Sequence, residues 1–506
     1  MTAKTTIAAL AFATLAACGT GPNDSASDCA SGQCDEQGQP YGLCAAIRGN
    51  GQLITAHYAA LARITEHYGI IDGSAGGSSA SITQFIAESV KMNPAVYECQ
   101  DGPCSETEER ARAALLLKSF PGYMMALSQT EEGIAIQELQ PFVAKVREAG
   151  IDSLLQQDAE AAAVVLADLL ESEDIRELLN PEVLELLDTS PNPEFHVADI
   201  LAGIQNMASF TTADVHIFVR PGLLEFESFG EKLGRAASFY AAYEPVDRRF
   251  MDTFLDSCAV PGLGRSWFEV MQIPAGEATC GDIFGAMLRE YREALLENES
   301  SFKSRIDEPV GANLAALVST SVLSGNAAAA FAAAREQYLS GEAVTELGVD
   351  WADVQFGYWG AAGDLERVAA NPQGYSDAKT GKFRSLGQTT WRQVLTYSPA
   401  EPGLARALEI DDGLVSAGGW SDLHPVLALK NMGCAKVVYI TRQGEESGFA
   451  IGVAQHLGMS DDENTALYDL DAADSSYSTS IAEADAVLCT NWNDIEATDI
   501  VGVTLD

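Results

Sequence analysis

The chain has 506 residues, of which 47% are apolar and 8% aromatic, so it is long enough to bury a core and too apolar to stay disordered. With 30 basic and 73 acidic residues, its net charge is −43. This acidity argues against nucleic acid as a partner, because phosphates would be repelled, and against electrostatic docking on anionic lipid.

The N-terminal segment indicates export. Residues 1–17 carry one charge and hold an apolar run, 7–17, that is too short to cross a bilayer. The run ends in Leu-Ala-Ala-Cys18, which resembles a bacterial lipobox. The resemblance implies cleavage before Cys18, lipid on its sulfur, and anchoring to a membrane of the bacterial cell envelope. The alternative is an ordinary signal peptide that contains a cysteine. Residues 18–42, rich in Gly, Ser, Asp, Gln and Pro, predict a flexible tether.

Two strand–helix units follow the tether. The apolar run 43–47 predicts a buried strand, the turn Gly49-Asn50-Gly51 breaks it, and 55–68 has helical periodicity. Ile70 and Ile71 predict the start of a second strand, which runs into a glycine- and serine-rich turn at 73–81 and then a helix. This alternation is typical of an α/β fold with a parallel sheet.

The rest of the chain predicts mostly helix. Helices are expected at 106–187, 223–243, 283–296, 312–338 and 448–457, and strands at 215–219, 437–441 and 486–490. We therefore expect an α/β core that holds a large helical insertion, with a few core elements threaded through it.

Ten cysteines are present, and export permits disulfides. Spacing favours four pairs, although it does not determine connectivity: Cys29–Cys34, Cys99–Cys104, Cys258–Cys280 and Cys434–Cys489. Cys44 would then be left over, buried in a strand. The cysteine spacing and the sparse histidines do not fit a zinc site, and we expect no metal or other cofactor.

The second glycine turn has the build of a nucleophile turn. A reactive serine needs a tight strand-to-helix turn that exposes its oxygen, beside a helix start that supplies N–H donors. Gly76-Gly77-Ser78-Ser79-Ala80 departs from G-x-S-x-G only in its last residue, which is still small, and Ser74 lacks the flanking pattern. The backbone N–H groups of Gly49, Asn50 and Gly51 could face a developing oxyanion.

These motifs, in this order, resemble the patatin-like phospholipase family. Its members join a strand to a glycine-rich oxyanion loop, a helix, a second strand and a G-x-S-x-G turn, and the spacing from His57 to Ser78 agrees with theirs. Downstream, the run S-P-A-E-P-G-L that begins at Ser398 resembles the family's small-residue segment. The run G-G-W-S-D-L-H-P-V, residues 418–426, resembles its D-G-G…P block.

The resemblance, which covers roughly 43–95 and 390–445, implies a fold and a function. The fold would be a patatin-like three-layer α/β/α core, made from 43–104 and 386–506, around a mainly helical insertion at 105–385. The function would be hydrolysis of phospholipids or other acyl lipids by a serine nucleophile, Ser78.

One departure from the family concerns the base. The family pairs its serine with the aspartate that opens D-G-G, and this chain has Ala417 there. A base must still take the serine proton. Asp422 lies five residues on, His424 is the only imidazole of the block, and Asp412 opens a D-G-L sequence. We take Asp422 and His424 as the candidate site residues.

Two alternatives to this function stay open. Ala417 is compatible with a catalytically impaired lipid-binding or scaffold lipoprotein on the same fold. His456 is placed late in the chain, as the histidine of a Ser-His-Asp α/β-hydrolase would be.

Two further motifs are better interpreted as structural than as functional. The acidic run 461–474 lacks EF-hand spacing and predicts a solvated loop. The apolar run 120–125 suits a buried core better than a lid tip.

Overall fold

A computed structural model describes residues 40–49, 54–127, 173–177, 226–262, 265–298, 302–326, 354–370, 383–400, 406–416, 422, 424–442 and 483–490, with single positions between 181 and 336. Several predictions lie outside these residues: the signal peptide, Cys18, most of the tether, the Cys29–Cys34 pair, Asn50, Gly51, Ala417, His456, the acidic run, the strand 215–219 and the helix 448–457.

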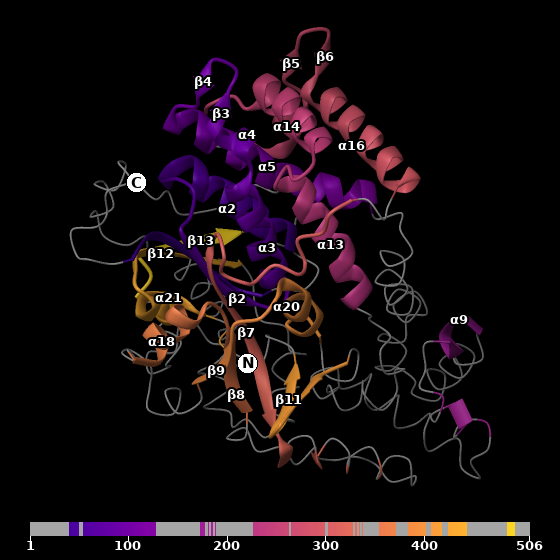
Figure 1. Cartoon of the computed structure of the whole chain (residues 1–506), viewed down its shortest axis with the longest axis vertical. Helices are drawn as coiled ribbons and strands as arrows, with labels where there is room; N and C mark the ends of the chain where they lie inside the picture. The colour runs from indigo at the N-terminus through magenta and orange to yellow at the C-terminus, as the bar shows by residue number, and fades with distance from the viewer. Residues whose placement is uncertain are drawn as a thin grey trace, which may run out of the picture.

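Nine of the described strands form one sheet (Figure 1). They are β1 (Tyr41–Ile47), β2 (Gly73–Gly77), β7 (Ala315–Ser324), β8 (Val354–Trp359), β9 (Phe383–Gly387), β10 (Leu408–Ile410), β11 (Gly413–Ser416), β12 (Cys434–Arg442) and β13 (Ala486–Thr490). Strands β7, β2, β1, β12 and β13 are parallel neighbours in that order. Strand β8 and the β10–β11 hairpin pair with β7 in the antiparallel sense. The expected α/β class is therefore confirmed.

Strand β7 organises the centre of the sheet. Val318 pairs with both β2 and β8, and Val322 pairs with both β11 and β8. Strands β2 and β11 therefore share one edge of β7, with β11 continuing beyond the end of β2. Strand β11 ends at Ser416 opposite Ser321, two residues past Ser319, which pairs with Gly77. Strand β11 thus ends beside the end of β2.

Helices cover both faces of the sheet (Figure 1). On one face lie α2 (Thr55–Tyr68), α3 (Ser79–Met92), α5 (Glu106–Leu127), α13 (Phe226–Tyr240) and α20 (Trp391–Tyr397); on the other lie α18 (Ala362–Ala370) and α21 (Val426–Met432). Alternate residues of β1 divide between the two cores: Ala45 and Ile47 pack with α2 and α3, while Cys44 and Ala46 pack with α21. Because both faces of β1 are buried over Cys44–Ile47, this stretch is wholly apolar.

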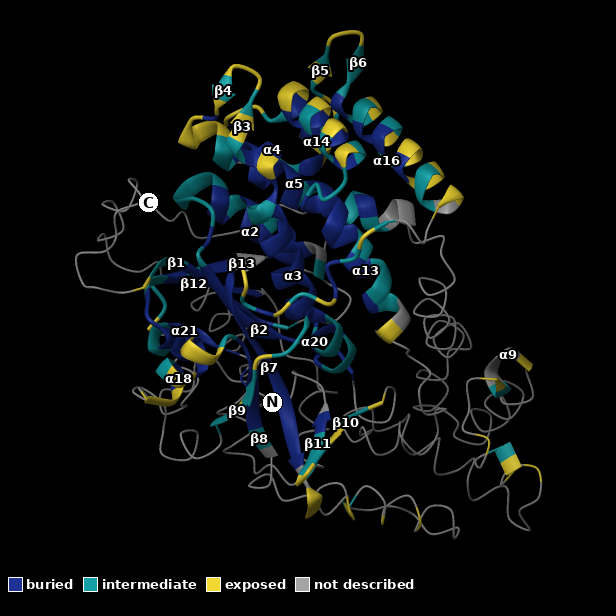
Figure 2. Ribbon diagram, in the orientation of Figure 1, coloured by how far each residue is buried: buried dark blue, intermediate teal, exposed yellow. Residues whose placement is uncertain are grey.

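Further helices extend the first face into a helical region. They are α4 (Pro94–Tyr97), α14 (Pro245–Cys258), α15 (Trp267–Met271) and α16 (Cys280–Glu297), with the hairpins β3 (Glu98–Cys99)–β4 (Gly102–Pro103) and β5 (Pro274–Ala275)–β6 (Ala278–Thr279). The short helix α9 (Glu173–Arg176) lies apart from this region (Figure 1). Figure 2 shows α16 with an exposed outer side and the central strands β2 and β7 buried. Phe120 and Tyr123 are buried against Tyr240, so they belong to the core. Among the described helices, none combines the length and hydropathy that a bilayer crossing demands.

One helix prediction and one strand start were wrong in part, and one strand prediction was short. The segment 312–338, expected as helix, holds strand β7 up to Ser324, whereas its described positions between 325 and 336 are helical. The alanine run that favours helix, 327–334, follows the strand, and β7 itself is rich in Val, Leu, Ser and Thr and pairs on both edges within a buried sheet. Ile70 and Ile71 precede the second strand, which is formed by Gly73–Gly77 itself. Strand β1 begins at Tyr41, two residues inside the expected tether.

Three disulfides connect described cysteines. Cys99–Cys104 and Cys258–Cys280 are formed as expected. The predicted pairing of Cys434 with Cys489 is wrong, and so is the unpaired Cys44, because Cys44 is bonded to Cys434. These two cysteines lie on the neighbouring parallel strands β1 and β12, with their Cα atoms 6.1 Å apart. Only the sheet topology brings them together, since 390 positions separate them in sequence.

Candidate active site

Ser78 occupies a sharp turn between β2 and α3. Its φ and ψ are 54° and −129°, a conformation that residues other than glycine rarely adopt. Such strain costs about 1–3 kcal/mol and concentrates at functional sites. Between Gly73 and Val90, Ser78 is the one residue that is not buried. The turn therefore presents a single serine to solvent from an otherwise buried strand–helix unit.

Small residues allow this turn to form. A Cβ atom on Gly76 would lie 2.4 Å from the carbonyl oxygen of Ile47 and 2.7 Å from Cβ of Ala80. Strand β1 and the first turn of α3 thus approach the backbone of β2 more closely than any side chain permits. Ala80, which stands where G-x-S-x-G has its last glycine, is fully buried in this contact.

The first glycine turn lies directly against Ser78. A Cβ atom on Gly49 would lie 2.7 Å from the carbonyl oxygen of Gly77 and 3.2 Å from Cβ of Ser78. Asn50 and Gly51 fall outside the described residues. Within the part of the chain that the structure describes, the Gly49 N–H donates no hydrogen bond. The fold thus brings Gly49, the first residue of the expected oxyanion loop, against the expected nucleophile.

His57 links the two turns. This buried side chain on α2 has Nε2 2.8 Å from the carbonyl oxygen of Arg48 and Nδ1 2.9 Å from Oγ1 of Thr83 on α3. Burial lowers the pKa of His57 to about 4, so its ring is neutral at neutral pH. A carbonyl oxygen only accepts, so Nε2 carries the proton. Because both ring nitrogens have partners, His57 is not the base for Ser78; the sequence marked it only as part of a helix start.

Ser398 fixes the backbone of the nucleophile turn. The N–H of Ser78 donates to Oγ of Ser398 over 2.9 Å, and that hydroxyl donates to the carbonyl oxygen of Ser319 over 3.0 Å. Ser398 is fully buried and begins the downstream S-P-A-E-P-G-L run. Two segments 320 residues apart in sequence therefore meet at the site. The sequence placed this run in a family motif and gave Ser398 no role.

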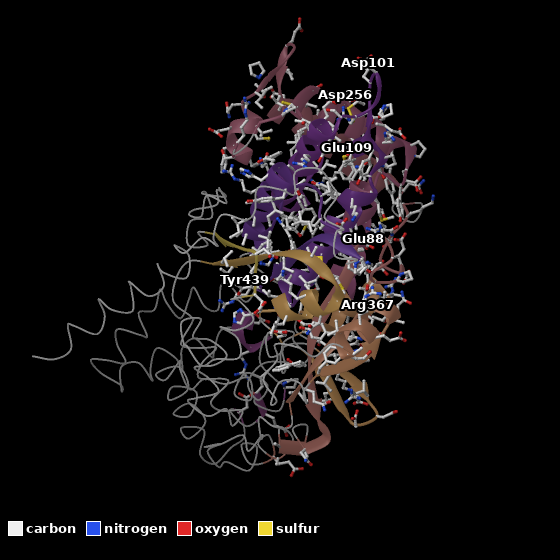
Figure 3. All side chains as sticks on the ribbon, turned by 90° about the vertical axis from the view of Figure 1, so that its left-hand side faces the viewer. Glu88, Asp101, Glu109, Asp256, Arg367 and Tyr439 are labelled. Carbon is white, nitrogen blue, oxygen red and sulfur yellow. A yellow bond between two sulfur atoms is a disulfide. The ribbon has the colours of Figure 1, made fainter. Side chains whose placement is uncertain are left out.

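A buried charge network holds helix α3 in place. Glu88 accepts hydrogen bonds from Arg305 over 3.0 Å and from the indole N–H of Trp391 over 2.7 Å, and its other oxygen accepts the backbone N–H of Asn313. Glu88, labelled in Figure 3, and Arg305 are both fully buried. A buried ion pair whose hydrogen bonds are satisfied is costly to break, so removing either partner is strongly destabilising.

The structure brings Asp422 and His424 together beside the sheet. One Asp422 oxygen accepts from the Tyr358 hydroxyl over 2.9 Å, and the other accepts the backbone N–H of His424 over 3.3 Å. Nδ1 of His424 lies 2.5 Å from the hydroxyl of Tyr439, a β12 residue labelled in Figure 3. Tyr358 and Tyr439 belong to the core between the sheet and α21, and both candidate residues are buried.

Within the described residues, the side chain of Ser78 forms no hydrogen bond. The register places Tyr358, the hydrogen-bond partner of Asp422, two strands away from Gly77, because Tyr358 pairs with Ser319, which in turn pairs with Gly77. Two strand spacings, about 10 Å, separate the backbones of Tyr358 and Gly77.

Asp412 does not suit the role of general base for Ser78. It lies in the turn of the β10–β11 hairpin, with its two oxygens 2.7 and 2.8 Å from the guanidinium of Arg384. The next residue, Gly413, pairs with Ser324, five positions beyond Ser319 along β7. At the usual rise of a strand this places the turn about 17 Å from the end of β2.

The structure also bears on Ser74 as a nucleophile and on metal-binding clusters. Ser74 is fully buried inside β2 and donates to Gln84, so it is not an accessible nucleophile. No group of three or more His, Cys, Asp or Glu side chains that could hold a metal occurs among the described residues.

Comparison with protein-family models, curated proteins and solved structures finds no match. The functional interpretation therefore depends on the motifs of this chain and on the geometry that joins them.

Proposed function

We propose that this chain is a serine acyl hydrolase acting on lipids, built on a patatin-like core, with Ser78 as the nucleophile. One observation carries the proposal: Ser78 is partly exposed at a strained strand-to-helix turn, with the Gly49 backbone against it. A serine that serves only as a turn residue needs neither the strain nor the adjoining glycine loop.

The chemistry follows from this arrangement. The Ser78 hydroxyl oxygen attacks the carbonyl carbon of an ester, and a base in the Asp422–His424 pair accepts its proton. Backbone N–H groups of the Gly49 loop and of the first turn of α3 stabilise the oxyanion. The intermediate then expels the alcohol, which takes the proton from the base, and water attacks the acyl-enzyme to release the carboxylic acid and free Ser78.

Covalent labelling tests the nucleophile. A fluorophosphonate probe should label the wild-type protein, and peptide mapping should place the adduct on Ser78. Ser78→Ala should prevent labelling, while Ser79→Ala, which changes the adjacent buried serine, should permit it. Labelling of the Ser78→Ala variant at the same rate as wild type would contradict the proposal.

Acyl lipid or phospholipid is the proposed substrate class, and the lipobox gives the protein a route to a membrane surface. We propose that Cys18 is lipidated and anchors the protein in the bacterial cell envelope. Wild type should partition with membranes and Cys18→Ser should not. If the two proteins fractionate alike, the anchor is not Cys18.

A second candidate function is lipid binding without catalysis. It is favoured by Ala417 at the family's aspartate position and by the tyrosine partners that Asp422 and His424 already have. Under this alternative, wild type would retain acyl-lipid binding but neither hydrolyse esters nor react with fluorophosphonate.

A further inference from the structure

We propose that His57 is a positioning residue that directs the Gly49 N–H toward the oxyanion. The inference rests on the proposed function, because it assigns a role within the same site. It concerns a side chain that lies outside the reacting groups and acts through the backbone of the glycine loop.

The peptide unit between Arg48 and Gly49 carries the effect. In a trans peptide the carbonyl and the following N–H point in opposite directions, and the described residues contain no cis peptide bond. His57 Nε2 holds the Arg48 carbonyl at 2.8 Å, and the Arg48 N–H donates to the carbonyl of Ile440 over 3.2 Å. The Gly49 N–H is thereby turned away from His57, in a loop that lies against Ser78.

The same imidazole also contacts the helix that carries the nucleophile. Its Nδ1 faces the hydroxyl of Thr83, which lies one turn into α3 from Ser78 and also approaches the carbonyl of Ser79. Because burial keeps the ring neutral, Nδ1 accepts a hydrogen bond from the Thr83 hydroxyl while Nε2 donates one to the carbonyl oxygen of Arg48. His57 therefore sets the distance between the oxyanion loop and the nucleophile turn, which a histidine that merely fills the core would not do.

Kinetics separate a positioning role from a structural one. An oxyanion forms only in the transition state, so a misdirected N–H should lower kcat and leave KM unchanged. We expect His57→Phe, which removes both ring nitrogens, to lower kcat by about 100-fold. His57→Gln, which keeps a donor for Arg48, should recover most of that loss. Ser119→Ala serves as the control, since it removes a buried hydrogen bond to Tyr240 away from the site.

Thr83→Val keeps the test valid if His57→Phe does not fold, as judged by circular dichroism. This nearly isosteric change frees Nδ1 and should lower kcat by about 3- to 10-fold at constant KM, the effect of losing one hydrogen bond. Unchanged kcat in the folded His57→Phe variant, or in Thr83→Val, would overturn the inference while leaving the hydrolase intact. Absence of turnover in wild type would instead remove the proposed function, and this inference with it.

Discussion

Replacing Asp422 with asparagine should lower kcat on acyl esters by about 10²–10⁴-fold, the usual effect of losing a general base. Asparagine keeps the size of the side chain, and its carbonyl oxygen can still accept from the Tyr358 hydroxyl, so the fold should survive. What is lost is the ability to take a proton from Ser78. The measurement is steady-state turnover of a soluble ester, with circular dichroism to confirm folding.

Asp412→Asn provides the matched control. It changes another aspartate of the same region, one that is paired with Arg384 at the hairpin turn, and it should leave turnover unchanged. If Asp422→Asn retains full activity and His424→Gln loses it, the base is the imidazole. If neither variant loses activity and Ala417→Asp raises turnover by orders of magnitude, the natural protein is a hydrolase that lacks its base.

Removing the Cys44–Cys434 disulfide should lower the free energy of unfolding by about 2–5 kcal/mol. The bond joins β1 to β12 and closes a loop of almost 390 residues, so its loss frees a very large denatured ensemble. The double variant Cys44→Ala/Cys434→Ala avoids leaving a free thiol. Chemical denaturation monitored by circular dichroism gives the difference.

Cys99→Ala/Cys104→Ala is the comparison for this effect. That disulfide spans only 5 positions in a partly exposed hairpin, so its removal should cost clearly less. If both double variants lose the same free energy of unfolding, the length of the loop that a disulfide closes does not determine how much it stabilises the protein. Neither cysteine of the Cys44–Cys434 pair lies in the site, so ester turnover of the folded double variant should stay near that of wild type.

The sequence predicted the parts of the fold whose signals are local. Helix α2 matches its expected range, and β13 does too. The turn at Ser78 was predicted from glycines and one serine, because a tight strand-to-helix connection admits few other residues. Expected pairs of close cysteines, such as Cys99–Cys104, were confirmed for the same reason: closing a short loop needs no tertiary information.

The features that the sequence missed depend on partners far away in the chain. Strand β7 lies directly before an alanine-rich run that favours helix, and its extended conformation depends on pairing with β2 and β8 along its two edges. No local sequence feature indicates that Ser398 will accept a hydrogen bond from the Ser78 backbone. Likewise, none indicates that Tyr358 will donate one to Asp422. The Cys44–Cys434 bond was likewise unpredictable until β1 and β12 were known to be neighbours.

The order of strands along the sheet also determines when the protein can mature. Strand β1, made early in synthesis, finds its neighbour β12 only after about 390 further residues, which takes on the order of 20–80 s of translation. Until then the edge of β1 that will face β12 is unpaired and must be kept apart from other chains. A chain truncated before Cys434 would lack β12 and β13, whatever its N-terminal motifs. Conversely, one proteolytic cut between Cys44 and Cys434 in the finished protein would yield two fragments that separate only under reducing conditions.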